Sequence, residues 1–154
     1  MRWMGISLLF AAGTLAMPAV AADGSGGGIE VSRAWAPATA QTGGDAPVYM
    51  TITNKGDTPD NLLRVRCPTD LADFTEKDVT DRGEGGTAIR EVKSFAIPAG
   101  GTLTLAPGGS QLRLLHLKGP LREGQTFTCS VAFQKAGTVP VEVKVAPPGA
   151  KEAA

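Results

Sequence analysis

The sequence has few of the residues that most often carry enzyme chemistry or bind metal ions. It contains one histidine, two cysteines and four methionines among 154 residues, and aromatic residues make up only 5% of them. Met1, Met4 and Met17 lie near the N-terminus, so Met50 is the one methionine in the rest of the chain. A metal centre with several imidazole ligands is therefore excluded, because His116 stands alone.

The chain also lacks an excess of charge of either sign and a long hydrophobic run. Its 15 Lys and Arg residues balance 15 Asp and Glu residues. Domains that bind nucleic acid usually carry a basic face, so we expect no nucleic-acid partner. Beyond the N-terminal segment no stretch approaches the ~20 apolar residues of a transmembrane helix. We therefore expect no membrane insertion after signal cleavage.

The first residues have the pattern of a secretory signal peptide. Arg2 gives a positive start, Leu8–Leu15 is apolar, and Ala19-Val20-Ala21 matches the small residues that signal peptidase accepts. We expect residues 1–21 to be removed, with cleavage after Ala22 as the alternative. There is no cysteine here for lipid attachment, so the predicted product is a soluble, exported, periplasmic protein.

Short segments of alternating hydrophobicity predict an all-β fold. They include Val48–Thr53, Thr102–Leu105, Thr126–Val131 and Val139–Val145. Short strands separated by frequent Gly, Pro, Asn and Asp turns are typical of a Greek-key β-sandwich. The same alternation places Met50 in the core.

The segments between and around these strands complete the predicted domain organisation. We expect one domain over residues 29–145, preceded by a flexible, glycine-rich leader at residues 22–28. The polar, glycine-rich segment Asp81–Thr87 is predicted to be an exposed loop. Residues 146–154 are predicted to form a disordered tail.

The two cysteines, Cys67 and Cys129, are expected to form a disulfide, because an exported protein meets an oxidising compartment. Cys129 alternates with core residues of its segment. Cys67 follows Leu63 and Val65, which we place on the apolar face, with Arg64 and Arg66 pointing outward. The alternative is a two-thiolate metal or redox site, which the separation of the two cysteines disfavours.

Five stretches recur in a characteristic order along the chain, namely Val31–Thr39, Val48–Asn54, Ile97–Leu103, Pro107–Gly109 and Leu117–Leu121. Together they resemble the PCuAC family of periplasmic copper chaperones. The resemblance implies a cupredoxin-like β-sandwich and a role in copper handling. It also implies a periplasmic protein partner, either a copper enzyme or an assembly factor.

Members of that family hold Cu(I) with His and Met residues, and the resemblance shows where these would fall. The aligned positions are Thr75, Lys77 (or Asp78, with one extra loop residue), Ile89, Gln111 and Arg113. None of these side chains is a soft donor of the kind that Cu(I) prefers. One Met and one His cannot rebuild the ligand set in any register, so we expect the usual Cu(I) site to be absent.

Cu(II) prefers nitrogen and oxygen donors, so a different site is the alternative. His116 is its candidate imidazole, with Asp73, Glu76, Asp78 or the mature N-terminal amine as further donors. A lone histidine in an apolar run is more often a packed or strand-edge residue, so no cofactor is the main expectation.

An enzyme is not expected. Ser110 and Ser130 lack the G-x-S-x-G setting of a serine nucleophile, and both cysteines are expected to be paired. The sequence therefore predicts a protein of copper handling or copper-enzyme assembly that acts by docking to a partner or by binding Cu(II) weakly. The alternative is a metal-free interaction module on the same scaffold.

Overall fold

A computed structural model describes residues 24–40, 42–83 and 85–153. This part of the chain contains eleven strands and no helix, and so no helix long and apolar enough to cross a membrane. The strands are β1 (Gly24–Gly26), β2 (Ile29–Pro37), β3 (Ala46–Asn54), β4 (Asp60–Arg66), β5 (Ala72–Gly83), β6 (Gly86–Glu91), β7 (Phe95–Ile97), β8 (Thr102–Leu105), β9 (Gln111–Leu117), β10 (Thr126–Phe133) and β11 (Gly137–Ala146). The prediction of an all-β, single-domain fold is confirmed.

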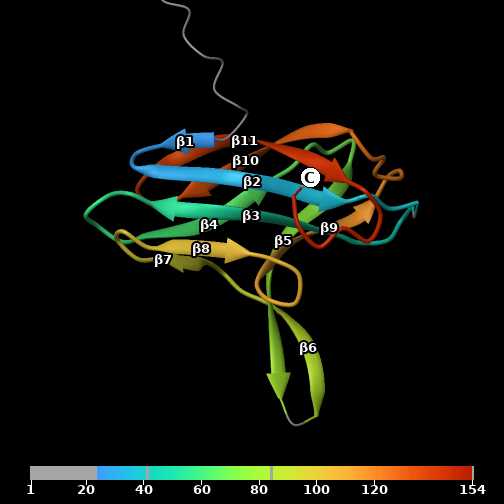
Figure 1. Ribbon diagram of the computed structural model, residues 1–154, viewed down its shortest axis with the longest axis horizontal. Coiled ribbons are helices and arrows are strands. Elements are labelled where there is room, and N and C mark those ends of the chain that lie inside the picture. Colours follow the sequence, from blue (N-terminus) through green and yellow to red (C-terminus); the bar gives the residue numbers. More distant parts are fainter. Residues whose placement is uncertain (1–23, 41, 84, 154) are drawn as a thin grey trace, which may run out of the picture.

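The strands pair in the order β6-β5-β9-β3-β2-β11-β10-β4-β7, with β1 added to β2 and β8 added to β3 (Figure 1). β3 changes partner along its length, because Ala46–Val48 pairs with β9 while Met50–Thr53 pairs with β8. The pairing of β11 with β2 is parallel, and the other described pairings are antiparallel. This curled sheet carries β5, β6 and β9 at one end.

Alternating side chains of the strands form one hydrophobic core. In β10 and β11 the buried set is Phe127, Cys129, Val131, Phe133, Val139, Val141, Val143 and Val145. Met50 belongs to the same core and is 1% exposed, as its alternation with Val48 and Ile52 predicted.

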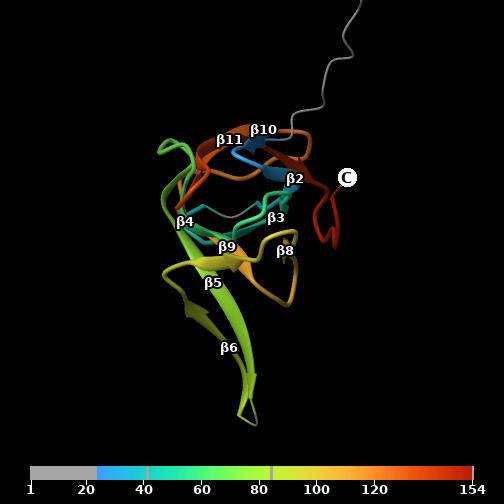
Figure 2. The ribbon, with the colours of Figure 1, turned by 90° about the vertical axis from the view of Figure 1, so that its left-hand side faces the viewer.

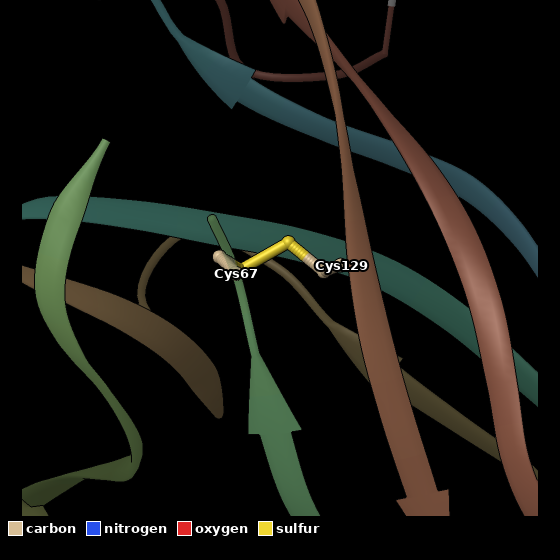
Figure 3. Close-up of a disulfide and its surroundings, with 2 residues drawn as sticks. All are labelled: Cys67 and Cys129. Carbon is tan, nitrogen blue, oxygen red and sulfur yellow. A yellow bond between two sulfur atoms is a disulfide. The ribbon is translucent and has the colours of Figure 1, made fainter. Parts of the chain in front are cut away.

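The disulfide between Cys67 and Cys129 is present, with the two Cα atoms 4.2 Å apart (Figure 3). Cys129 is fully buried on β10, and Cys67 packs against the core directly after β4. The bond therefore fixes the end of β4 to the middle of its neighbouring strand. The predicted pairing is confirmed.

The register of β4 differs from the prediction at one residue. Arg64 lies opposite Ala132 and Leu62 lies opposite Phe133, so Leu63 is the extra residue of a β-bulge. The bulge changes the phase of the side chains, and Leu63 is 43% exposed while Leu62 and Val65 are buried. The placement of Leu63 on the apolar face was wrong, because simple alternation does not allow for an inserted residue.

The predicted flexible leader differs from the structure over its described part. Gly24–Gly26 forms β1 and pairs with β2. The chain reverses at Gly27 and Gly28, which have positive φ values of 56° and 84°. Two consecutive positive φ values are the requirement of the tight hairpin turn that glycine best satisfies. Residues 22 and 23, like the predicted signal peptide, lie outside the described residues.

The predicted loop at Asp81–Thr87 is instead part of a long β-hairpin. β5 and β6 pair as far as Gly83 and Gly86, and the hairpin extends beyond the rest of the sheet in both views (Figures 1 and 2). Every residue of β6 is exposed, so the exposure was right and the loop assignment was wrong. Neither face of the hairpin end is buried, so its strands have no alternation of apolar and polar residues. The polar, glycine-rich composition therefore predicted a loop.

The predicted disordered tail, residues 146–154, differs from the structure over its described part, because Ala146 is the buried last residue of β11 and Ala150 and Ala153 pack against the domain. The Ala150 N–H donates a hydrogen bond to the carbonyl of Pro147. Ala150 and Ala153 pack against Trp35 and Tyr49, whose ring centroids are 4.9 Å apart. The small apolar side chains of the tail cover an aromatic pair that would otherwise face solvent.

Candidate functional site

The register of β5, β6 and β9 shows which of the aligned copper positions share a face. Arg113 lies opposite Glu76, and Gln111 lies opposite Asp78. On the other side of β5, Ile89 lies opposite Thr80. Directly opposed residues point to the same face of a sheet, and so do residues two apart on one strand. Gln111, Arg113 and Ile89 are therefore brought to one face, together with Glu76 and Asp78.

Two of the aligned positions are not brought to that face. Thr75 lies opposite Leu114, and Lys77 lies opposite Leu112. Both leucines are fully buried, so Thr75 and Lys77 project from the other side of the sheet. Of the two alternatives for one ligand position, the register places Asp78 beside the other aligned residues and Lys77 away from them.

The shared face holds an ion-pair cluster centred on Arg113. Its Nε lies 2.8 Å from Asp78 Oδ2, its Nη2 lies 3.1 Å from Glu76 Oε2, and its Nη1 lies 3.8 Å from Asp45 Oδ2. We call Asp45, Glu76, Asp78 and Arg113 the Arg113 cluster. One guanidinium thus faces three carboxylates, two of them from β5 and one from the residue preceding β3.

Asp78 is the buried member of the Arg113 cluster, with no solvent exposure. Its contact with Arg113 is at ion-pair distance, but the Nε–H is not aligned for a hydrogen bond, and neither carboxylate oxygen accepts one from any described residue. Burial raises the pKa of the Asp78 carboxyl. The Arg113 charge opposes this increase, whereas Glu76 and Glu91 add to it. The ionised form of Asp78 therefore depends on Arg113.

His116 lies at the end of β9, outside the Arg113 cluster. Its side chain is 62% exposed, and its Nδ1 is 3.5 Å from Asp73 Oδ2. Lys118 also contacts Asp73, at 3.2 Å. The backbone has a left-handed φ of 57°, and its N–H donates to Asp45 Oδ1 at 3.3 Å. Among the described residues, no group of three His, Cys, Asp or Glu side chains is arranged to hold a metal ion.

Asp60 is a buried acid that the sequence analysis did not identify. The N–H groups of Asn61 and Lys135 donate to its Oδ1 at 2.8 and 2.9 Å, and the N–H of Ala136 donates to its Oδ2 at 2.9 Å. The carboxylate thus fixes the turn between β10 and β11 to the start of β4. Two of its three donors are more than 70 residues away, so no local pattern points to it.

The family model described as "Putative lipoprotein LpqE-like" matches residues 29–145. The chain belongs to the LpqE-like family. A relative from Leifsonia xyli subsp. xyli (strain CTCB07), named "Putative lipoprotein Lxx21020", is 35% identical over 119 residues. The match covers 77% of this LpqE-like chain and 69% of the relative.

Solved structures of PCuAC domains share the fold of this LpqE-like chain. The apo PCuAC domain of PmoF1 is 28% identical with a TM-score of 0.70, and the match covers 82% of this chain and 99% of that domain. The Cu(I) form of DR1885 from Deinococcus radiodurans is 30% identical with a TM-score of 0.57, and the match covers 88% and 83% of the two chains. The resemblance to PCuAC proteins and the predicted cupredoxin-like β-sandwich are therefore confirmed.

Proposed function

We propose that this LpqE-like chain is an exported, non-enzymatic protein of copper handling that assists copper-enzyme assembly by docking to a protein partner. A role with copper is supported by its likeness to PCuAC domains, since the solved DR1885 structure is of a Cu(I) form. The family and relative names also support export, because both contain the word lipoprotein. In this proposal the chain works without the usual Cu(I) site of PCuAC proteins.

The observation that carries this proposal is the Arg113 cluster on the face shared by Ile89, Gln111 and Arg113. Arg113 supplies a permanent positive charge there, and its carboxylate partners are hard oxygen donors. Cu(I) prefers sulfur and imidazole ligands, and a nearby guanidinium repels any cation. Arg113 thus offsets part of the acidic charge of the cluster from within the chain.

A gene deletion in the host tests the function. We expect the copper content and activity of exported copper enzymes to fall, and the full chain to restore both. Titration of the purified protein with Cu(I) and Cu(II), against competing chelators, should show no stoichiometric retention of Cu(I). Copper enzymes that remain fully loaded in the deletion strain would contradict the proposal.

The lack of a group of three metal donors in the described part of the chain favours a second candidate. In this candidate the scaffold is a metal-free interaction module whose partner has no connection with copper. Capture of the same partner with and without copper, together with normal copper enzymes after gene deletion, would favour it over the first proposal.

A further inference from the structure

A surface groove of about 580 Å³ lies between β4 and β5, and no residue of the Arg113 cluster lines it. Its walls are formed by Leu63–Cys67 on one side and by Ala72–Thr75 on the other, with Thr69 and Lys77 completing it. We call it the β4–β5 groove. The disulfide at Cys67 fixes the end of the first wall to β10 (Figure 3).

Both walls of the β4–β5 groove are strand edges without a partner strand in the described structure. β4 pairs with β10 through Leu62–Arg66, but it pairs with β7 only through Asp60–Leu62. β5 pairs with β9 from Ala72 onward, but its pairing with β6 begins at Asp78. The sheet therefore remains open between these edges. An open edge offers backbone N–H and C=O groups to an added strand.

The groove also gathers exposed apolar side chains. Three large hydrophobic residues of the described chain are exposed, namely Leu63 at 43%, Phe74 at 62% and Ile89 at 52%. Leu63 and Phe74 line this groove, one on each wall. The bulge in β4 interrupts the alternation of buried and exposed residues and directs Leu63 out of the core. The Leu63 side chain is thereby available as an apolar contact at the edge of the strand.

The charge of the groove is positive. Arg64, Arg66 and Lys77 line it, and none of them has an ion-pair partner among the described residues. The one acid on its walls, Asp73, is 3.2 Å from Lys118. The chain has zero formal net charge, so three unpaired cations in one groove make it a local positive site that attracts negatively charged groups.

We propose that the β4–β5 groove binds an extended, acidic segment of a partner protein, which adds as a strand to the open edge of β4. Alternate side chains of such a segment face opposite sides. Acidic side chains on one side meet Arg64, Arg66 and Lys77, and apolar ones on the other side meet Leu63 and Phe74. This inference rests on the proposed partner docking and specifies its surface and chemistry.

A second copy of the chain is a poorer occupant. The strands at the two ends of its sheet are β6, in which Arg90 and Glu91 cancel, and β7, which has no charged residue. Neither strand therefore offers the groove a net negative charge. Binding of an acidic segment is favoured because it satisfies the cations, the apolar side chains and the open backbone edge together.

The test uses the mature protein with its disulfide intact and a short, fluorescein-labelled peptide of alternating Glu and Val. Fluorescence anisotropy should show saturable binding, and NMR should shift the backbone amides of Leu63–Arg66. The double variant Arg64→Gln/Arg66→Gln should weaken binding about tenfold, because it removes two exposed charge pairs with the peptide. Arg122→Gln/Lys144→Gln removes the same charge elsewhere and should leave binding unchanged.

Two further peptides separate strand addition from simple charge attraction. A peptide with alternate N-methylated amides should bind much more weakly, because it cannot complete the backbone hydrogen bonds. A peptide of alternating Lys and Val should not bind. The double variant Leu63→Ser/Phe74→Ser should also weaken binding, and an unchanged urea midpoint would show that it folds.

Equal peptide binding by wild type and Arg64→Gln/Arg66→Gln would overturn the inference, as would amide shifts confined to other strands. Self-association that Leu63→Ser/Phe74→Ser abolishes would identify a second copy as the occupant and also overturn it. The copper-enzyme assay in the deletion strain is independent of the peptide. If the full chain restores copper loading while the peptide does not bind, the groove assignment fails and the proposed function stands.

Discussion

The Nε of Arg113 lies 2.8 Å from Oδ2 of Asp78, in a diagonal contact between β9 and β5. Asp78 is fully buried, whereas the Arg113 side chain is 28% exposed. The contact therefore joins a solvent-accessible cation to a carboxylate that accepts no hydrogen bond from the described residues. The contribution of this ion pair to the free energy of unfolding can be measured.

Arg113→Met should destabilise the domain strongly. The substitution leaves the buried Asp78 carboxylate without its cation, and removing one partner of a buried pair costs about 3 kcal/mol or more. Urea unfolding at neutral pH measures the loss. The matched control is Arg90→Gln. Arg90 forms an ion pair with Asp81 in which both side chains are exposed, so this substitution should cost less than about 1 kcal/mol. Equal losses in the two variants would contradict the burial argument.

Asp78→Asn should change how stability depends on pH. Burial raises the pKa of Asp78 in the folded state, so ionisation of this group disfavours folding as the pH rises above its unfolded value. The stability of Asp78→Asn relative to wild type should therefore increase from acidic pH up to the folded pKa and then level off. Urea midpoints across this range measure the effect, with the exposed Asp81→Asn as control. A constant difference at all pH values would refute the assignment.

Asp60→Asn should show the opposite dependence. Burial alone would raise the pKa of Asp60, but hydrogen bonds from the N–H groups of Lys135, Asn61 and Ala136 outweigh it and lower the pKa overall. A lowered pKa contributes stability above the unfolded value, which is lost as the pH falls through the folded one. The variant should lose about 2 kcal/mol at neutral pH and approach wild type in acid. A loss of equal size at all pH values would show that ionisation is not involved.

Reduction of the Cys67–Cys129 disulfide should lower the free energy of unfolding by about 4 kcal/mol, because the bond closes a long loop in the unfolded chain. Urea unfolding with and without a phosphine reductant measures the change. The variant Cys67→Ala/Cys129→Ala should match the reduced protein and no longer respond to reductant. A reductant effect that persists in this variant would mean that the change comes from elsewhere.

The strands and the disulfide were predictable because alternation reports burial directly, as Phe127, Cys129 and Val131 show. The phase was lost at Leu63, where an inserted residue breaks the alternation. The β5–β6 hairpin was missed because no face of β6 is buried, so its sequence carries no hydrophobic period. A local hydrophobic pattern cannot detect strands that bury no apolar face.

The alignment named single positions, and their grouping required the structure. Ile89, Gln111 and Arg113 lie on one face, and Asp45 joins the Arg113 cluster from a distant segment. The choice between Lys77 and Asp78 also required the register of β5 against β9, since a shift of one residue exchanges the two faces.

The register allows the proposed absence of the usual Cu(I) site to be tested by rebuilding such a site. The variant Asp78→Met/Ile89→Met/Gln111→His/Arg113→Met places three thioethers and one imidazole on the shared face. These are soft donors suited to Cu(I), and the same changes remove both the repelling guanidinium and the buried carboxylate. We expect this variant to retain one Cu(I) per chain against a competing chelator, whereas wild type retains none.

The matched control keeps Ile89→Met, Gln111→His and Arg113→Met. It replaces Asp78→Met by Asp78→Asn, which still removes the buried carboxylate charge, and adds Lys77→Met as the third thioether. Lys77 lies opposite the buried Leu112, so its sulfur projects from the other side of the sheet. This control should hold Cu(I) much more weakly, and X-ray absorption should detect fewer sulfur neighbours of copper. If both variants bind Cu(I) equally well, the face assignment of Asp78 is wrong, since sheet geometry allows only one of two adjacent residues to join the set.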